Sequence, residues 1–346
     1  MKTLFDICKT TFLIIGAIIG VGFITGAELV GFFGVENFFS NVILATVFLA
    51  LALAFSFSRF TGKNGIKVLT NGNKFYRASI LFSSLIFSAS MLAGIDSLLN
   101  TVIDLKSFQI GSIVAIILIS IFSKFGVNGM EKLNLFLMPI VIITVNILIF
   151  TRQEIVVEKL KSVTFGGGIK ALLYVFMNVF ISIPIMVETV KNKSKKSLFV
   201  VSVLVAFVIG TEAFIILSAI KNSTINMNGD MPLYVALFSG NFSCVYFISM
   251  LACGLTSAFS AYYPLYVYAK EKSNVFGLTV CALLTVIVAK MGLSGIVSYA
   301  YPIVGGLGVL FFIKCISIKS KTYADNNSNC LKNGGSICQK RKRIKL

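Results

Sequence analysis

The sequence predicts an all-helical integral membrane protein with about ten membrane-spanning helices. Of its 346 residues, 57% are hydrophobic and only 13% are charged, and the mean hydropathy is +0.92. Soluble domains carry about 25% charged residues, so this composition excludes an ordinary soluble domain. The apolar residues also form long runs that are separated by short charged segments.

The apolar runs have the length of membrane spans. A helix that crosses the hydrocarbon core, roughly 30 Å thick, needs about 20 apolar residues. The first run is too long for a signal peptide and lacks a small-x-small cleavage site. Ten stretches qualify, the fourth and ninth being short: 11–33, 37–58, 77–103, 108–123, 133–150, 169–190, 197–220, 241–268, 274–290 and 294–315.

The charge distribution indicates the orientation in the membrane. The net charge is +18, from 31 Lys and Arg against 13 Asp and Glu. These charges form no basic surface interleaved with aromatic residues, so we expect no nucleic-acid partner. Cytoplasmic loops are rich in Lys and Arg, and a cytoplasmic N-terminus places most of the basic residues inside, with the 151–168 loop as the exception. We expect a multi-pass cell-membrane protein in contact with the lipid bilayer, with both termini cytoplasmic.

The composition also excludes several kinds of chemistry. The chain has no His and no Trp, so zinc–histidine sites, histidine general bases and Ser-His-Asp hydrolysis are absent. Its 7 Cys lie in spans or on the reducing side and form no disulfide framework. No cofactor motif is present, and no ring-forming repeat of a channel occurs. We therefore expect neither an enzyme nor an organic cofactor.

Two spans contain residues that interrupt helices. In a bilayer a broken helix survives only where it lines a cavity, and such spans point to a transporter's binding site. In span 1 the glycines predict a break at 19–23, although Gly16 and Gly20 also suit close helix packing. In span 6, Asn178 and Pro184 predict a second break, or Pro184 is an ordinary kink.

The two interrupted spans occupy corresponding positions in two five-span halves. The halves cover about 10–150 and about 168–316, which is the pattern of an inverted 5+5 repeat. We therefore expect one transmembrane domain over 1–318, followed by a basic, disordered cytoplasmic tail over 319–346.

A break in span 1 would present backbone groups to ligands. Freed carbonyls of Gly16 and Ile19 would face a cation, and freed N–H groups of Val21 and Gly22 would face an anion such as a substrate carboxylate. Glycine allows a ligand to approach the backbone closely because it has no Cβ. The predicted substrate segment is Ile19, Gly20, Val21, Gly22 and Phe23.

Span 8 offers hydroxyl groups to the same cation. Cys253, Thr256, Ser257 and Ser260 share one side of a helix. Adjacent hydroxyls with a carbonyl one turn earlier form an all-oxygen set suited to sodium, although Ser and Thr also bond to their own helix. Together with span 1 they predict a sodium site formed by Gly16, Ile19, Cys253, Thr256 and Ser257.

Three acidic residues lie within spans. An ionisable group in the membrane is by default a functional candidate. Glu28 either holds a substrate ammonium, carries a proton, or reaches outward to solvent, and Asp96 in span 3 has similar alternatives. Glu212 lies among apolar residues of span 7, where we expect a neutral, hydrogen-bonded structural role.

The residues of span 1 resemble a known signature. Gly20-Val-Gly22-Phe23-Ile-Thr25-Gly26-Ala-Glu28-Leu, followed by Phe32-Phe33, is similar to the opening motif of the YkvI family of bacterial membrane proteins. The Leu-Tyr174-x3-Asn178 segment of span 6 and the ten-span pattern also resemble that family. The family looks like a distant branch of the amino acid–polyamine–organocation superfamily, whose members share the LeuT-type inverted repeat.

The resemblance implies a secondary transporter with its site between spans 1, 3, 6 and 8. It implies the second sodium site of that superfamily at the span 1 and span 8 residues named above. The substrate carboxylate would meet the Val21 and Gly22 amides, with Tyr174, Asn178 and Ser182 as further substrate contacts in span 6. The segment 222–240 would form the short external helix that often caps this fold.

The sequence departs from that superfamily in two places. Sodium-coupled neurotransmitter-type members have Asn directly after the second Gly, where this chain has Phe23. The Gly-rich break of their span 6 is replaced by the segment from Asn178 to Pro184. The first sodium site and the substrate pocket of those members are therefore not carried over.

Two functions follow from these residues. The first is a symporter of a small amine or amino acid, coupled to Na+ or alternatively to H+, that works by alternating access around a midplane site. The second is a membrane sensor that binds a small metabolite without moving it, similar to the membrane subunit of spore-germinant receptors. Cation-coupled flux distinguishes the two.

Overall fold

The computed structural model describes residues 2–60, 73–100, 109–155, 160–190, 193–223, 229–238, 243–272 and 274–317. Within these ranges the chain forms helices and connecting turns, and no strand occurs. The expected tail, 319–346, lies outside the described residues.

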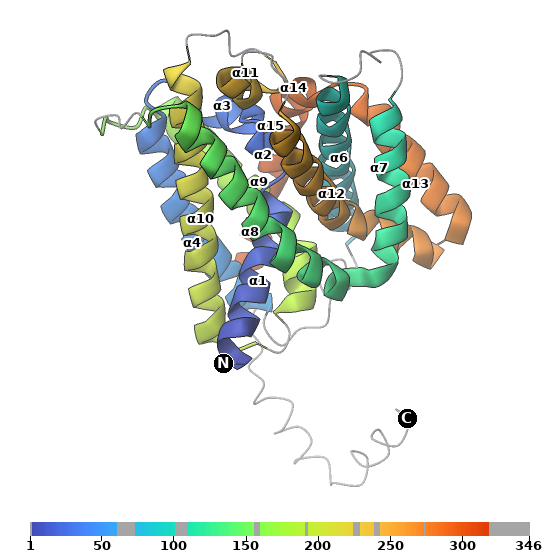
Figure 1. Ribbon diagram of the computed structural model, residues 1–346. Coiled ribbons are helices and arrows are strands. Elements are labelled where there is room, and N and C mark those ends of the chain that lie inside the picture. The colour runs from blue at the N-terminus through green and yellow to red at the C-terminus, as the bar shows by residue number, and fades with distance from the viewer. Residues whose placement is uncertain are drawn as a thin grey trace, which may run out of the picture.

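The helices follow the apolar stretches of the sequence (Figure 1). They are α1 (Lys2–Ile18), α2 (Val21–Ile24), α3 (Ala27–Phe33), α4 (Phe38–Phe60), α6 (Lys74–Asn100), α7 (Ile110–Phe122), η1 (Ser123–Phe125), α8 (Gly126–Arg152), α9 (Phe165–Thr189), α10 (Lys195–Asn222), α11 (Pro232–Phe238), α12 (Cys244–Lys272), α13 (Asn274–Ala289), α14 (Leu293–Gly295), η2 (Ile296–Ala300) and α15 (Tyr301–Ser317).

Among the described residues, seven helical segments are long and apolar enough to cross a membrane, with Val275–Ala289 as a shorter apolar helix. Large apolar side chains such as Phe136, Ile147 and Phe207 point outward and are more than half exposed. An apolar exterior of this extent is unfavourable in water and is satisfied by lipid chains. The protein is therefore a multi-pass helical membrane protein in contact with the bilayer.

The expected break in span 6 is wrong. The structure has one continuous helix there, α9, with Pro184 inside it. Proline removes one backbone donor, and membrane helices tolerate this loss because neighbouring groups satisfy the freed carbonyl. The alternative, an ordinary proline within the helix, is the arrangement found.

The fourth and fifth stretches are continuous in the structure. A single-turn 3-10 segment, η1, joins α7 to α8, so α8 begins at Gly126 rather than at the expected 133. Gly126 has a φ of 61°, a left-handed conformation that glycine adopts without strain. The chain changes direction at this point (Figure 1).

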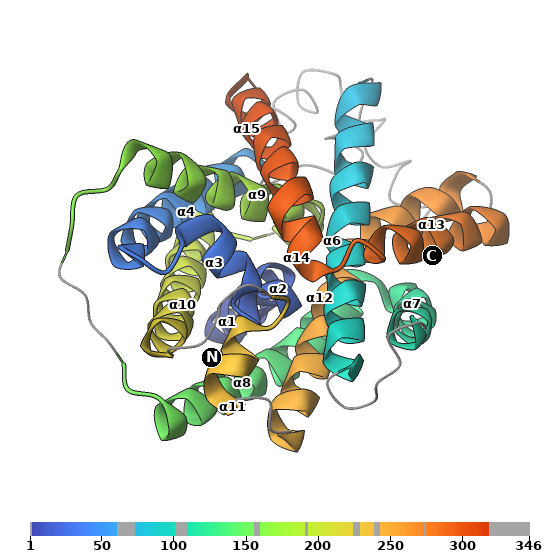
Figure 2. The same ribbon diagram turned by 90° about the horizontal axis from the view of Figure 1, so that it is seen from above.

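The first span lies inside the helical bundle. α1 packs against α8, α9, α10 and α12, while α2 packs against α6 and α12. Figure 2 shows α1 and α2 near the middle of the molecule, with longer helices around them. The broken span is thus held by protein rather than by lipid.

Candidate functional site

The first span is interrupted where the glycines predict. α1 ends at Ile18 and α2 begins at Val21, with Gly20 in an extended conformation (φ −110°, ψ −173°). A second interruption follows at Gly26, which has a φ of 80° and precedes α3. Both interruptions are buried, so the freed backbone groups must find partners within the protein.

The carbonyl freed by the first interruption faces α12. The Ser257 hydroxyl donates a hydrogen bond of 2.6 Å to the Ile19 carbonyl, and the Cys253 thiol approaches the same oxygen at 3.3 Å. Both side chains are buried. The structure therefore brings Ile19, Cys253 and Ser257 together, but through the Cys253 thiol and not through the Cys253 carbonyl that the predicted sodium site uses.

The other two residues of that predicted set have different partners. The Thr256 hydroxyl donates to the Cys253 carbonyl of its own helix at 2.9 Å. Gly16 lies one turn below the break against α8, where an added Cβ would be 2.5 Å from the Asn134 side chain. Gly16 thus serves the close packing of α1 and α8 that was its alternative role.

The Val21 N–H, freed at the start of α2, faces α6. The Val21 N–H points at the Met91 sulfur at 3.3 Å, and an added Cβ at Gly20 would lie 2.4 Å from the Met91 methyl. A thioether is a weak acceptor, so a carboxylate would satisfy this donor better. Nothing in the sequence distinguished Met91 from other apolar residues of its span.

Glycines on two helices receive the Val21 side chain. An added Cβ at Gly94 of α6 would lie 2.3 Å from Val21, and one at Gly254 of α12 would lie 2.8 Å from it. Phe23, on the same short helix, is fully buried. These contacts fix α2 between α6 and α12.

A second polar cluster lies around Glu28 on α3. The Glu28 side chain is 1% exposed, and its carboxyl group faces the Asn178 side chain and the Tyr174 ring of α9. Tyr301, at the start of α15, also faces Glu28, and its hydroxyl shares a hydrogen bond of 2.6 Å with Ser90 of α6. The structure therefore brings Glu28, Tyr174 and Asn178 together.

Aromatic rings enclose this cluster. Phe32 and Phe33 of α3 contact Tyr174 edge to face, with ring centroids 5.5 and 4.9 Å apart. Phe87 of α6 stacks on Tyr301 at 4.5 Å. The aromatic pair in the span 1 motif thus packs against the tyrosine in the span 6 motif, two segments that are far apart in the sequence.

Two predicted substrate residues do not face the break. The Asp96 carboxylate accepts hydrogen bonds from the Ser112 backbone N–H at 2.9 Å and from the Ser112 hydroxyl, which joins α6 to α7. The Ser182 hydroxyl donates to the Asn178 carbonyl of its own helix at 2.8 Å. Glu212 accepts a hydrogen bond of 2.7 Å from Asn146, in keeping with the expected structural role.

The segment expected to form an external cap contains α11. Its Leu233 N–H donates a 2.8 Å hydrogen bond to the Thr25 carbonyl at the second interruption. Just before α11, Asp230 accepts from the Ser97 hydroxyl at 2.5 Å and from the Ser294 N–H at 2.8 Å. Burial opposes ionisation of Asp230, but the hydrogen bonds from Ser294 and Ser97 outweigh it, so the pKa of Asp230 lies below its usual value.

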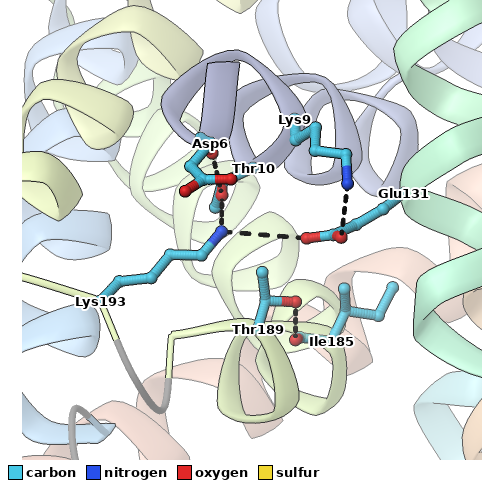
Figure 3. Close-up of polar contacts among 7 residues, drawn as sticks. All are labelled: Asp6, Lys9, Thr10, Glu131, Ile185, Thr189 and Lys193. Carbon is cyan, nitrogen blue, oxygen red and sulfur yellow. Dashed lines mark hydrogen bonds and ion pairs between the residues drawn. The ribbon is translucent and has the colours of Figure 1, made fainter. Parts of the chain in front are cut away.

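The opposite end of the broken span carries a charged cluster (Figure 3). Glu131 of α8 pairs with Lys9 of α1 and with Lys193, which precedes α10, each at 3.8 Å. The Lys193 ammonium also donates to the Thr10 hydroxyl. Burial lowers the pKa of Lys193, partly offset by Glu131. A cavity of about 620 Å³ borders the cluster, with Asp6 and the residues of both ion pairs among its lining.

Comparisons with known proteins agree with the membrane assignment. No protein-family model matches the chain. The uncharacterized membrane protein YkvI of Bacillus subtilis (strain 168) is 24% identical to it over 330 residues, which covers 88% of this chain and 93% of that protein. The chain is thus similar, along most of its length, to a membrane protein without an assigned activity.

Proposed function

We propose that the protein is a cation-coupled secondary transporter of a small amine or amino acid, and not an enzyme. The observation that carries this proposal is the freed Ile19 carbonyl, which meets Ser257 and Cys253 of another helix in the buried middle of the bundle. A broken helix costs backbone hydrogen bonds, and in membrane transporters such breaks bind ions and substrates. A cation that enters here would be coordinated by the Ile19 carbonyl oxygen and the Ser257 hydroxyl oxygen.

We further propose that the chain has ten spans in a LeuT-type 5+5 inverted repeat, with a cytoplasmic N-terminus. The packing of the helices supports this topology. In such a repeat α1 corresponds to α9, α4 to α10, α6 to α12, α7 to α13 and α8 to α15. The contact between α1 and α8 in the first half then has its equivalent in the contact between α9 and α15, and the α4–α9 contact has its equivalent in α10–α1. Likewise, the α6–α7 contact has its equivalent in α12–α13, and the α6–α13 contact in α12–α7. The similarity to YkvI and the span 1 motif support membership of the same family.

In this proposal the substrate lies beside the break. Its carboxylate would replace the Met91 sulfur at the Val21 N–H, and its ammonium group would lie toward Glu28. α11 and Asp230 close the outer side, while the cluster around Glu131 borders the inner cavity. Sodium is the first choice of coupling ion and a proton the second.

Transport is tested by uptake into proteoliposomes. The purified protein is given a labelled amino-acid mixture or labelled methylamine under an inward sodium gradient, an inward proton gradient, or no gradient. We expect accumulation under the sodium gradient and none in protein-free vesicles. Ligand-dependent thermal stabilisation without accumulation under any gradient would contradict the proposal and favour the sensor.

A further inference from the structure

We infer that Glu28, Tyr174 and Asn178 form a second cation site, separate from the Ile19–Ser257 contact. Its ligand is a small monovalent cation, either an alkali-metal ion or a protonated primary amine. Only the choice of these two kinds of cation rests on the proposed transport function. The site itself follows from the hydrogen bonds that its side chains do not make.

Three buried polar atoms of this cluster lack a well-placed hydrogen-bond partner. Glu28 Oε1, Asn178 Oδ1 and the Tyr174 hydroxyl oxygen make no hydrogen bond of acceptable geometry among the residues that the structure describes, although the Asn178 side chain lies close to both Glu28 and Tyr174. The Asn178 amide nitrogen already donates to the Tyr174 carbonyl at 3.0 Å, which fixes its Oδ1 as an acceptor. A carboxylate and an amide oxygen both accept, so the group that would satisfy them is a donor or a cation.

The surroundings make this deficit costly. The side chains of Glu28, Tyr174 and Asn178 are at most 2% exposed. A buried charge is tolerated only when it is paired or coordinates a metal. Within the described part of the chain, no Lys or Arg is paired with Glu28. Glu28 is therefore either protonated or paired with a cationic ligand, and we infer the cationic ligand because the Asn178 amide oxygen beside it also lacks a donor.

The packing limits the size of that ligand. Phe32 and Phe33 cover the Tyr174 ring, and Tyr301 is held by Ser90 and Phe87. On the remaining side an added Cβ at Gly22 would lie 3.4 Å from Glu28 Oε2. Such close packing favours a bare alkali ion or an ammonium head group over a guanidinium group, which is larger and prefers a planar partner.

The site uses other helices and other chemistry than the first. Glu28 lies on α3, and Tyr174 and Asn178 lie on α9, whereas the Ile19–Ser257 contact joins the end of α1 to α12. No residue belongs to both. Substitutions can therefore remove one site and leave the other.

Cation binding is tested by thermal unfolding of the purified full-length protein. Titrations of NaCl, LiCl, KCl and methylammonium chloride replace choline chloride at constant ionic strength. They are repeated in a Ser257→Ala background, so that the contact to Ile19 does not contribute. We expect a saturable rise in Tm, and Glu28→Gln should raise the half-maximal concentration at least about 10-fold, because a charged ligand loses its counter-charge.

Glu212→Gln is the matched control. Glu212, in α10, is likewise a buried carboxyl group, but it has Asn146 as a partner, so its substitution should leave the cation response unchanged. Tyr174→Phe removes one oxygen with little change in shape. It should weaken the response more mildly and replaces Glu28→Gln if that variant does not fold.

The response also identifies the source of the cation. A response to alkali ions alone assigns a coupling ion, and one to methylammonium alone assigns the substrate amine. Equal responses of Glu28→Gln and unsubstituted protein would overturn the inference. So would a Tm that responds to pH but to none of the cations, since a proton would then occupy Glu28. The measurement needs no flux, so a failed uptake experiment leaves its result standing.

Discussion

Two neighbouring hydroxyls on α12 have different partners. Ser257 donates across the bundle to the Ile19 carbonyl at 2.6 Å, whereas Thr256 donates within its own helix. We predict that Ser257→Ala abolishes sodium stimulation of uptake and that Thr256→Val preserves most of it. Ser257→Ala should also cost about 1–3 kcal/mol of stability, because a buried carbonyl loses its best donor. Sodium-dependent uptake and Tm check both; equal losses in the two variants would place Thr256 in the cation's coordination shell.

At the residue scale, the sequence predicts the position of the helix break in span 1 better than it predicts which side chains contact one another. The glycines of span 1 predicted the break, although glycines also serve close packing, as Gly16 does here. The motif also named Glu28, Tyr174 and Asn178, which meet in the structure. Met91 carried no signal, since its role comes from the contact with Val21. The partner of Asp96 could not be foreseen either, because the turn of α7 brings Ser112 to it.

At the scale of elements, the docking of α2 depends on glycines in its neighbours. An added Cβ at Gly94 of α6 would lie 2.3 Å from a methyl of Val21. We predict that Gly94→Ala costs about 1–3 kcal/mol of stability through overpacking, and that it lowers uptake because α2 must shift.

Gly306→Ala is the control for this substitution. Gly306 also lies within a helix, but an added Cβ there meets nothing within 4 Å. Alanine favours helix by about 1 kcal/mol over glycine, so Gly306→Ala should leave Tm unchanged or raise it. Thermal unfolding of both variants gives the comparison. A Gly94→Ala protein as stable as the control would show that α6 does not set the position of α2.

Hydropathy predicted the helices but not every interruption. An apolar run of span length must satisfy its own backbone hydrogen bonds in the bilayer, which a helix does, so the helical state of these runs was predictable. The break predicted at Pro184 is wrong because α9 is buried along much of its length, and its packing compensates for the loss of one backbone hydrogen bond. The short helices around Gly20 and Gly26 depend on α6, α11 and α12, and these contacts lie outside the local pattern.

At the scale of the whole molecule, Asp230 joins three parts of the chain at the end of the bundle opposite the N-terminus (Figure 1). It accepts from Ser97 near the end of α6 and from Ser294 in α14, and it lies two residues before α11. We predict that Asp230→Asn lowers stability by about 1–3 kcal/mol, because charge-assisted hydrogen bonds are lost. The pKa of Asp230 is lowered in the folded protein, so its contribution is complete above its unfolded pKa of about 3.9 and is lost as pH falls below it. Tm measured from pH 7 to 3 should therefore fall less steeply at the acid end in Asp230→Asn; parallel curves would contradict this.

Different polar contacts close the two ends of the broken span: the ion pairs of Glu131 at one end and the hydrogen bonds of Asp230 at the other. We call these contacts the two closures, and Cys253 lies between them. Its thiol is fully buried and touches the freed Ile19 carbonyl, so its alkylation reports whether the break is open to water. Glu131 pairs with both Lys9 and Lys193 at one end (Figure 3), while Asp230 accepts hydrogen bonds at the other.

We predict that Glu131→Gln speeds alkylation of Cys253 by an impermeant maleimide added on the side of the N-terminus. Asp230→Asn should speed it from the opposite side, because each substitution releases one closure. The measurement uses protein whose other cysteines are replaced by Ser, with Glu36→Gln, an exposed carboxylate between α3 and α4, as the control for loss of charge. A transported cation that orders the break should slow both reactions. Faster reaction from both sides in either variant would mean that the substitution loosens the bundle as a whole, and the two closures would then not act separately as alternating access requires.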